Sequence, residues 1–127
     1  MSREIKFRAW DKKDKVMVDF SHPYLAVVGE RIRNYSLGYD SEGNYRQQEN
    51  IIYMQYTGLK DKNDVEIYEG DILRFSEGDC RAVSYDYERT GFKLASEDPV
   101  NPLWQMHKFM EVIGNIYETP ELLEAEL

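Results

Sequence analysis

The chain has 127 residues, and 24 acidic against 16 basic side chains give it a net charge of −8 at neutral pH. This length suits one domain, and 42% apolar with 31% charged residues is typical of a globular protein rather than a disordered one. The charge disfavours nucleic acid as a partner, because such a protein repels phosphate backbones unless its basic residues gather on one face.

The cysteine content and the N-terminus indicate a cytoplasmic protein. Cys80 is the single cysteine and cannot form an internal disulfide. The first residues, MSREIKFRAWDKK, carry charges where a signal peptide has an apolar segment. No run approaches about 18 consecutive apolar residues, so we predict no membrane span and no membrane partner.

The N-terminal residues predict a β-hairpin. EIKFRAW alternates, with Phe7 and Ala9 on one face and Trp10 on the other, as in a half-buried strand. DKKDK is a turn, and VMVDF, residues 16–20, returns as the partner strand.

Residues 21–50 are the hardest part to assign, and their polarity makes them a candidate variable loop region. Within this region, the segment 25–28 indicates a strand. A hairpin is expected around residues 41–44, because Gly43 and Asn44 tolerate a positive φ.

The second half of the chain predicts a meander of short strands at 51–58, 65–68, 71–75, 80–87, 92–95 and 111–118. The segment 103–110 fits either a strand or a short helical turn. Gly114 marks a bulge or a close approach, and TPELLEAEL predicts a short C-terminal helix capped by Thr119 with Pro120 in its first turn. Closely spaced strands joined by turns indicate a mostly-β barrel or sandwich.

The stretch 56–75, YTGLKDKNDVEIYEGDILRF, holds five acidic residues and raises the question of a metal site. A calcium loop starting at Asp61 needs an oxygen ligand at its fifth position and glycine at its sixth, but these are Val65 and Glu66. A transition metal favours histidine or cysteine beside the carboxylates, and the stretch has neither. We therefore predict no metal and no cofactor, and assign these carboxylates to turns.

Motifs for nucleophilic catalysis and for phosphate binding are absent from the sequence. We therefore expect that the protein is not an enzyme and has no catalytic residues. Its ten tyrosines, against five phenylalanines and two tryptophans, suit both strand packing and contact surfaces. Trp10, Tyr53 and Tyr56 form a candidate binding surface; packing within the barrel is the alternative for the same rings.

Three separated blocks carry a family resemblance: REIKFRAWDKKDKVM, IIYMQYTGLKDKNDVEIYEGDILRF and MEVIGNIYETPELL. In this order and spacing they resemble the YopX family of phage and prophage proteins. The resemblance implies one family domain over residues 1–127, a small SH3-like barrel, and a location in a bacterial host cell. It implies no reaction and no cofactor.

The residues of the family pattern have turn, cap and packing roles, and here they are Trp10, Gly58, Asp61, Tyr68, Gly70, Asp71, Gly114 and Pro120. At one position the chain departs from the pattern, because Asp64 stands where the family usually has glycine. The turn must therefore place Asp64 in the left-handed region or use another geometry.

Three functions remain open on this reading. The first is a non-enzymatic phage accessory protein that binds an unknown host or phage protein, or an acidic variant that mimics nucleic acid toward a host DNA-binding protein. The second is a small barrel that binds nucleic acid. This function would require that basic residues cluster beside exposed aromatic side chains, and the candidates are Arg3, Arg8, Lys12, Lys13 and Lys15. The third is an enzyme with a carboxylate-lined cleft. Unpaired strand edges and tyrosine-rich faces also predict a homo-oligomer.

Overall fold

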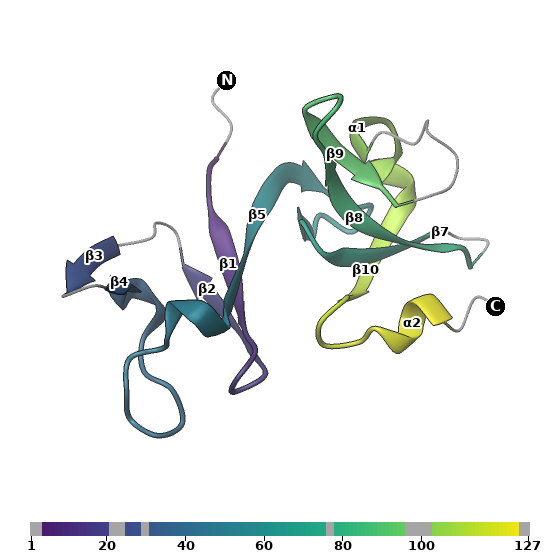
Figure 1. Cartoon of the computed structure of the whole chain (residues 1–127). Helices are drawn as coiled ribbons and strands as arrows, with labels where there is room; N and C mark the ends of the chain where they lie inside the picture. Colours follow the sequence, from purple (N-terminus) through teal and green to yellow (C-terminus); the bar gives the residue numbers. More distant parts are fainter. Residues whose placement is uncertain (1–3, 21–24, 29–30, 76–77, 96–102, 125–127) are drawn as a thin grey trace. The chain divides into compact units, whose positions relative to one another are not determined.

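The computed structural model describes residues 4–20, 25–28, 31–75, 78–95 and 103–124 (Figure 1). The chain divides into two compact units, an N-terminal unit (Met1–Gln55) and a C-terminal unit (Tyr56–Leu127). Strand β5 (Ile51–Lys60) contributes its first half to one unit and its second half to the other.

The N-terminal unit is built around strand β1 (Phe7–Asp11), which pairs antiparallel with β2 (Val16–Phe20) and with the first half of β5. This confirms the predicted N-terminal hairpin. The prediction of one exposed face on β1 is wrong, because Ala9 on one face is fully buried and Trp10 on the other is only 8% exposed. Trp10 is itself apolar, so it gives the second face a side chain that gains from burial.

A second hairpin follows in the N-terminal unit, formed by β3 (Leu25–Val28) and β4 (Arg31–Asn34). The strand expected at 25–28 is therefore confirmed, whereas β4 was missed because its sequence, RIRN, has a single apolar residue. Two short 3₁₀ helices, η1 (Tyr35–Leu37) and η2 (Gln48–Asn50), flank the expected turn at 41–44. Residues 21–24 and 29–30 of the candidate variable region lie outside the described residues.

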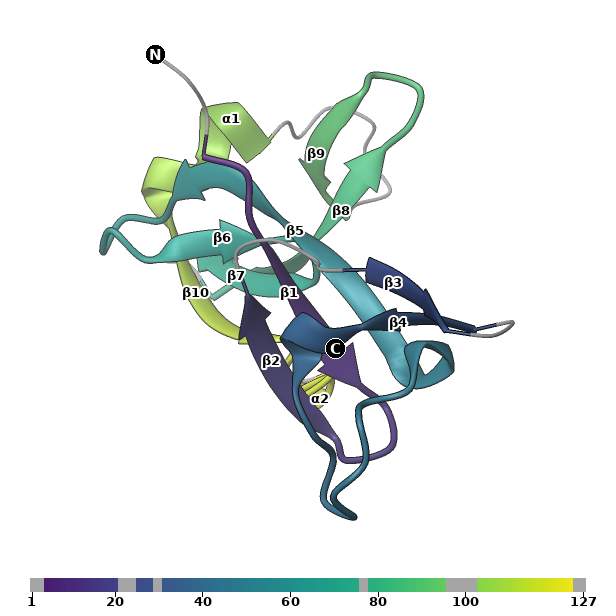
Figure 2. The same cartoon turned by 90° about the vertical axis from the view of Figure 1, so that its left-hand side faces the viewer.

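In the C-terminal unit, strands β6 to β10 follow the second half of β5 (Figure 2). The second half of β5 pairs with β6 (Glu66–Tyr68), and a four-stranded antiparallel sheet has the order β10-β7-β8-β9. These strands are β7 (Asp71–Phe75), β8 (Cys80–Asp86), β9 (Gly91–Leu94) and β10 (Met110–Asn115). The helices are α1 (Leu103–Met106), η3 (His107–Phe109) and the C-terminal α2 (Glu121–Glu124). The predicted mostly-β fold with a small barrel and a C-terminal helix is confirmed.

The apolar core of the C-terminal unit draws on strands and helices alike. Its buried members are Ile67, Leu73, Val83, Leu94, Leu103 and Met110. Half-buried apolar side chains such as Leu59 and Phe92 pack against this cluster. The segment 103–110, which fitted either a strand or a helical turn, is helical at its start, where α1 supplies Leu103 to the core. It joins β10 only at Met110.

Two glycines shape strands at positions that the sequence marked. Gly58 was expected to end its strand, but β5 continues to Lys60, because a positive φ of 85° at Gly58 accommodates a register shift in the pairing with β6. In β10, the register against β7 shifts between Val112 and Gly114, which confirms the predicted bulge. No helix among the described residues is both long and apolar enough to cross a membrane.

Candidate functional site

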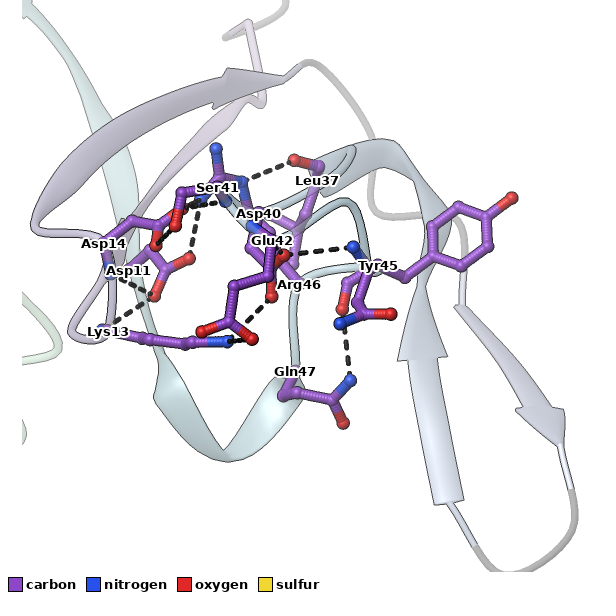
Figure 3. Close-up of polar contacts among 11 residues, drawn as sticks. Asp11, Lys13, Asp14, Leu37, Asp40, Ser41, Glu42, Tyr45, Arg46 and Gln47 are labelled. Atoms are coloured by element: carbon purple, nitrogen blue, oxygen red, sulfur yellow. Dashed lines mark hydrogen bonds and ion pairs between the residues drawn. The ribbon is translucent and has the colours of Figure 1, made fainter.

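The loop of residues 38–46, between η1 and η2, lies against the β1–β2 turn of residues 12–15 and forms a dense polar cluster with it (Figure 3). Tyr39 and Tyr45 form an isolated antiparallel bridge across its base. A positive φ of 86° at Gly43 allows the reversal at its tip, as the glycine-containing turn predicted.

Arg46 joins the base of the loop to the β1–β2 turn. Its Nη1 atom lies 2.6 Å from Oδ2 of Asp11 and 3.0 Å from Oδ2 of Asp14, while its Nε donates to the carbonyl of Leu37 at 3.1 Å. The Arg46 and Asp11 side chains are only 14% and 2% exposed. Such charge-assisted bonds in a shielded place are short and strong, and losing one partner leaves a buried charge uncompensated.

Ser41 adds a second connection between the loop and the turn. Its backbone N–H donates to Oδ2 of Asp14 at 2.8 Å, and its hydroxyl donates to Oδ1 at 2.8 Å. The hydroxyl of Ser41, assisted by Arg46, holds the pKa of the Asp14 carboxyl below its usual value. Asp14 therefore stays ionised at neutral pH.

Asp40 closes the tip of the loop and receives the third connection. Its Oδ1 accepts the backbone N–H groups of Glu42 at 2.9 Å and Asn44 at 3.0 Å, and its Oδ2 lies 3.1 Å from Nζ of Lys13. The N–H of Asn44, together with Lys13, lowers the pKa of Asp40. The hydrogen bond to Asp40 raises the pKa of Lys13, which also pairs with Glu42 at 3.2 Å.

The same loop presents two stacked tyrosines. The rings of Tyr39 and Tyr45 have centroids 4.6 Å apart and an interplanar angle of 22°, and the Tyr39 hydroxyl donates to that of Tyr45 at 3.2 Å. The Tyr39 side chain is 59% exposed, and the ring of Tyr45 points away from the carboxylates (Figure 3). The loop thus carries an aromatic pair on one side, with Tyr39 exposed and Tyr45 half-buried, and its charged attachments on the other.

The charged side chains of this cluster attach the 38–46 loop to the β1–β2 turn. Four carboxylates face two cations, which leaves the cluster with a net charge of −2: Asp11, Asp14, Asp40 and Glu42 against Lys13 and Arg46. Because Asp14 and Asp40 are held ionised, neither suits a general acid at neutral pH. Across the described ranges, no group of three or more histidine, cysteine, aspartate or glutamate side chains is placed to hold a metal ion.

The three aromatic residues of the expected binding surface are not exposed together. Trp10 and Tyr56 are buried, at 8% and 4% exposure, and only Tyr53 presents its ring, at 38%. Tyr56 packs its ring against that of Tyr68, with centroids 5.4 Å apart. Of the three, Tyr53 alone could meet a partner.

The acidic stretch of the C-terminal unit uses its carboxylates to hold turns. Oδ1 of Asp61 accepts the N–H groups of Asn63 at 2.8 Å and Val65 at 2.9 Å, and its Oδ2 accepts the N–H of Val112 in β10 at 2.8 Å. Asp64 has a positive φ of 67°, so the residue that replaces the usual glycine adopts the left-handed conformation. This agrees with the predicted assignment of these residues to turns.

The remaining residues of the family pattern also lie at turns and close contacts. Gly70 has a φ of 89°, donates its N–H to Val83 at 2.9 Å, and accepts from Ile116 at 2.9 Å. Asp71 is buried and accepts the N–H of Tyr68 at 2.7 Å.

At the start of α2, the backbone carbonyl of Pro120 accepts from Leu123 at 3.2 Å. The hydroxyl of Thr119, expected to cap this helix, instead bonds the backbone N–H and carbonyl of Asn115. Oδ1 of Asn115 in turn accepts the N–H groups of Tyr117 and Glu118, so the turn that leads into α2 is organised by Asn115.

The basic residues of the N-terminus that the structure describes differ in their exposure and their partners. Arg8 is 9% exposed and Lys13 is engaged by Asp40, while Arg3 lies outside the described residues. Lys12 and Lys15 are exposed on the β1–β2 turn. This arrangement lends no support to the nucleic-acid hypothesis.

Comparison with known proteins places the chain in a family. The model of the family described as "YopX protein" matches residues 6–124. The crystal structure of protein EF1440 from Enterococcus faecalis is 27% identical, with a TM-score of 0.63 and coverage of 96% of this chain and 99% of that one. Protein yopX from Bacillus subtilis shares the fold at 18% identity and a TM-score of 0.54, with coverage of 93% and 95%. No curated protein matches. The family match extends over nearly the whole chain and across both units, and the chain therefore belongs to the YopX family.

Proposed function

We propose that this protein is a non-enzymatic accessory protein of a phage or prophage, which acts in the bacterial cytoplasm by binding another protein. The observation that supports this most is the stacked pair of Tyr39 and Tyr45, held on a loop that three charged connections attach to the β1–β2 turn. A tyrosine such as the exposed Tyr39 contributes a large contact area at a small loss of conformational entropy, and a fixed loop lowers the cost of ordering it on binding.

The chemistry of the partner follows from the surroundings of the pair. The protein carries a net charge of −8, and the loop carboxylates Asp40 and Glu42 are engaged within the loop or with Lys13. Such a surface repels nucleic acid and favours a protein surface that offers apolar or basic side chains to the tyrosine rings.

A capture experiment tests this function. The tagged protein, a Tyr39→Ala/Tyr45→Ala variant and a Tyr87→Ala control are incubated with nuclease-treated lysate of the bacterial host. Tyr87 suits as the control because it is 84% exposed but lies in the C-terminal unit. We expect wild type and control to retain a protein that the double variant loses. The proposal is overturned if nothing is retained, if the retained molecule is nucleic acid in untreated lysate, or if the double variant binds equally well.

A further inference from the structure

The 38–46 loop is closed by its own backbone. The N–H of Asp40 donates to the carbonyl of Asn44 at 2.7 Å, the N–H of Gly43 donates back to Asp40 at 3.1 Å, and the N–H of Arg46 donates to Gly38 at 3.0 Å. None of these bonds involves the β1–β2 turn. The loop can therefore keep its internal shape when it is detached from the turn.

The connections described above between the loop and the turn run through charged side chains: Arg46 to Asp11 and Asp14, Ser41 to Asp14, and Lys13 to Asp40 and Glu42. The loop begins at Gly38, which has a φ of 75° and no atom within 4 Å of the place where a Cβ would stand. Just before it, Leu37 is buried, at 3% exposure, and fixes the start of the loop. Gly38 can therefore act as a hinge between the buried Leu37 and a loop that ion pairs hold in place.

We propose that the 38–46 loop is a strap that opens and closes on the β1–β2 turn as one body, with Arg46 as its lock, and that the closed position presents Tyr39 and Tyr45. The inference rests on the proposed function, since it concerns the control of that binding surface. Opening separates Arg46 from Asp11 and Asp14, so two carboxylates are left facing each other without their cation. Like charges this close repel, and the strap therefore depends on Arg46 more than on its other connections.

Acid is the second way to release the strap. Arg46 and the Ser41 hydroxyl face Asp14, Lys13 faces Asp40, and η1, which contacts β2, carries no charged residue. The pKa values of Asp14 and Asp40 are lowered by these partners, so the strap stays closed at neutral pH. When both carboxyls take up protons, the ion pairs of Arg46 with Asp11 and of Lys13 with Glu42 are left, and the strap opens more often.

Amide exchange with water, resolved by NMR, separates an opening strap from a melting loop. The N–H of Ser41 is bonded across to Asp14, whereas the N–H of Gly43 is bonded within the loop. In Arg46→Met we expect the Ser41 amide to exchange at least about tenfold faster, while that of Gly43 changes by less than about threefold. Arg89→Met, which removes the partner of Asp86 in the C-terminal unit, is the matched control and should leave Ser41 unchanged.

The same measurement on the wild-type protein covers the case in which Arg46→Met fails to fold. Between pH 5 and pH 2, the protection factor of Ser41 should fall while those of β1 and Gly43 persist. The strap is overturned if Ser41 is unaffected by both treatments, or if Ser41 and Gly43 lose protection together. The capture experiment above reports on binding alone, so a strap that opens while Tyr39→Ala/Tyr45→Ala still binds would refute the proposed function and leave this inference standing.

Discussion

Gly114 shows how a single missing side chain permits a close contact in the C-terminal unit. A Cβ atom there would stand 2.1 Å from Oγ1 of Thr119 and 2.9 Å from Cδ1 of Leu122. Thr119 is held by Asn115 and cannot move away freely. The close approach that the sequence suggested at Gly114 is therefore between the end of β10 and the start of α2.

We expect Gly114→Ala to lower the free energy of unfolding by about 1–3 kcal/mol, the usual cost of forcing extra atoms into a packed place. Gly91→Ala is the control, because the nearest atom to its Cβ would be the Arg89 carbonyl at an ordinary 4.0 Å. That control should stay within about 0.5 kcal/mol of wild type in urea unfolding. Equal stability of the two variants would contradict the role given to Gly114.

Asp64 and Gly70 both adopt a positive φ, of 67° and 89°. Glycine adopts this conformation without strain, whereas the Cβ atom of aspartate makes it less favourable. Replacing Asp64 by glycine relieves the left-handed conformation, so we expect Asp64→Gly to be neutral or more stable by a few tenths of a kcal/mol. Gly70→Val should cost more than about 1 kcal/mol, because a β-branched residue is strained there. Urea unfolding of both variants measures this, and a stable Gly70→Val protein would contradict it.

Between elements, Asp61 works as a cross-link. Its carboxylate satisfies two N–H groups of the β5–β6 turn and the N–H of Val112, which is 51 residues away in the chain. The N–H of Lys62 also donates to Met110 at 3.0 Å, so this turn is fastened to β10 at two points. A short turn thereby fixes the position of the last strand of the C-terminal unit.

Asp61→Asn keeps one acceptor oxygen but turns an amide NH₂ toward a donor that the carboxylate had satisfied. We expect it to lower the free energy of unfolding by about 2 kcal/mol or more, since hydrogen bonds to a charged group contribute about 1.5–3 kcal/mol each. Asp79→Asn removes a half-exposed carboxylate paired with Arg81 and should cost less than about 1 kcal/mol. Denaturation by urea, followed by circular dichroism, compares the two. An Asp61→Asn protein as stable as Asp79→Asn would show that the cross-link is dispensable.

Segments in which β-branched and aromatic residues dominate, such as the first part of β5, were predictable as strands, because this pattern suits a pleated strand that packs against a core. The β4 strand was not, since RIRN lacks that pattern. The charged cluster was equally hidden. Arg46 meets Asp11 across 35 residues of chain, and only the turn at Gly43 and Asn44 could indicate that the segment folds back. Spacing along the sequence cannot show which distant charges a loop brings together.

For the molecule as a whole, the lowered pKa values of Asp14 and Asp40 predict an acid-sensitive stability. The unfolded chain binds protons more readily at these sites than the folded chain. Their contribution is therefore complete above the ordinary carboxyl pKa of about 3.9 and is lost as the pH falls through the lower folded values. Asp14→Asn should reduce the loss of stability measured by urea unfolding between pH 5 and pH 2. Asp64→Asn, with a side chain 84% exposed, should leave it unchanged. Parallel profiles for wild type and Asp14→Asn would count against this account.

The expected self-association is also a property of the whole molecule. Trp104 and Phe109, on α1 and η3, are each 66% exposed, which leaves large aromatic rings for contact. We expect light scattering at micromolar concentration to report a species larger than the 15.1 kDa chain, and Trp104→Ser/Phe109→Ser to reduce its mass. A single 15.1 kDa species of the wild-type protein would refute this prediction.

The pairing of β7 with β10 sets an order of events during synthesis. The N-terminal unit has all its strands once Gln55 has left the ribosome, so it can begin to form while translation continues. The C-terminal unit must wait for β10, because β7 and the Asp61 carboxylate both bind partners in residues 110–115. Until then the β7 edge is open, and a pause in translation before residue 110 would expose it to neighbouring chains. Truncation of the gene in this interval should therefore give an aggregating product rather than a smaller folded protein.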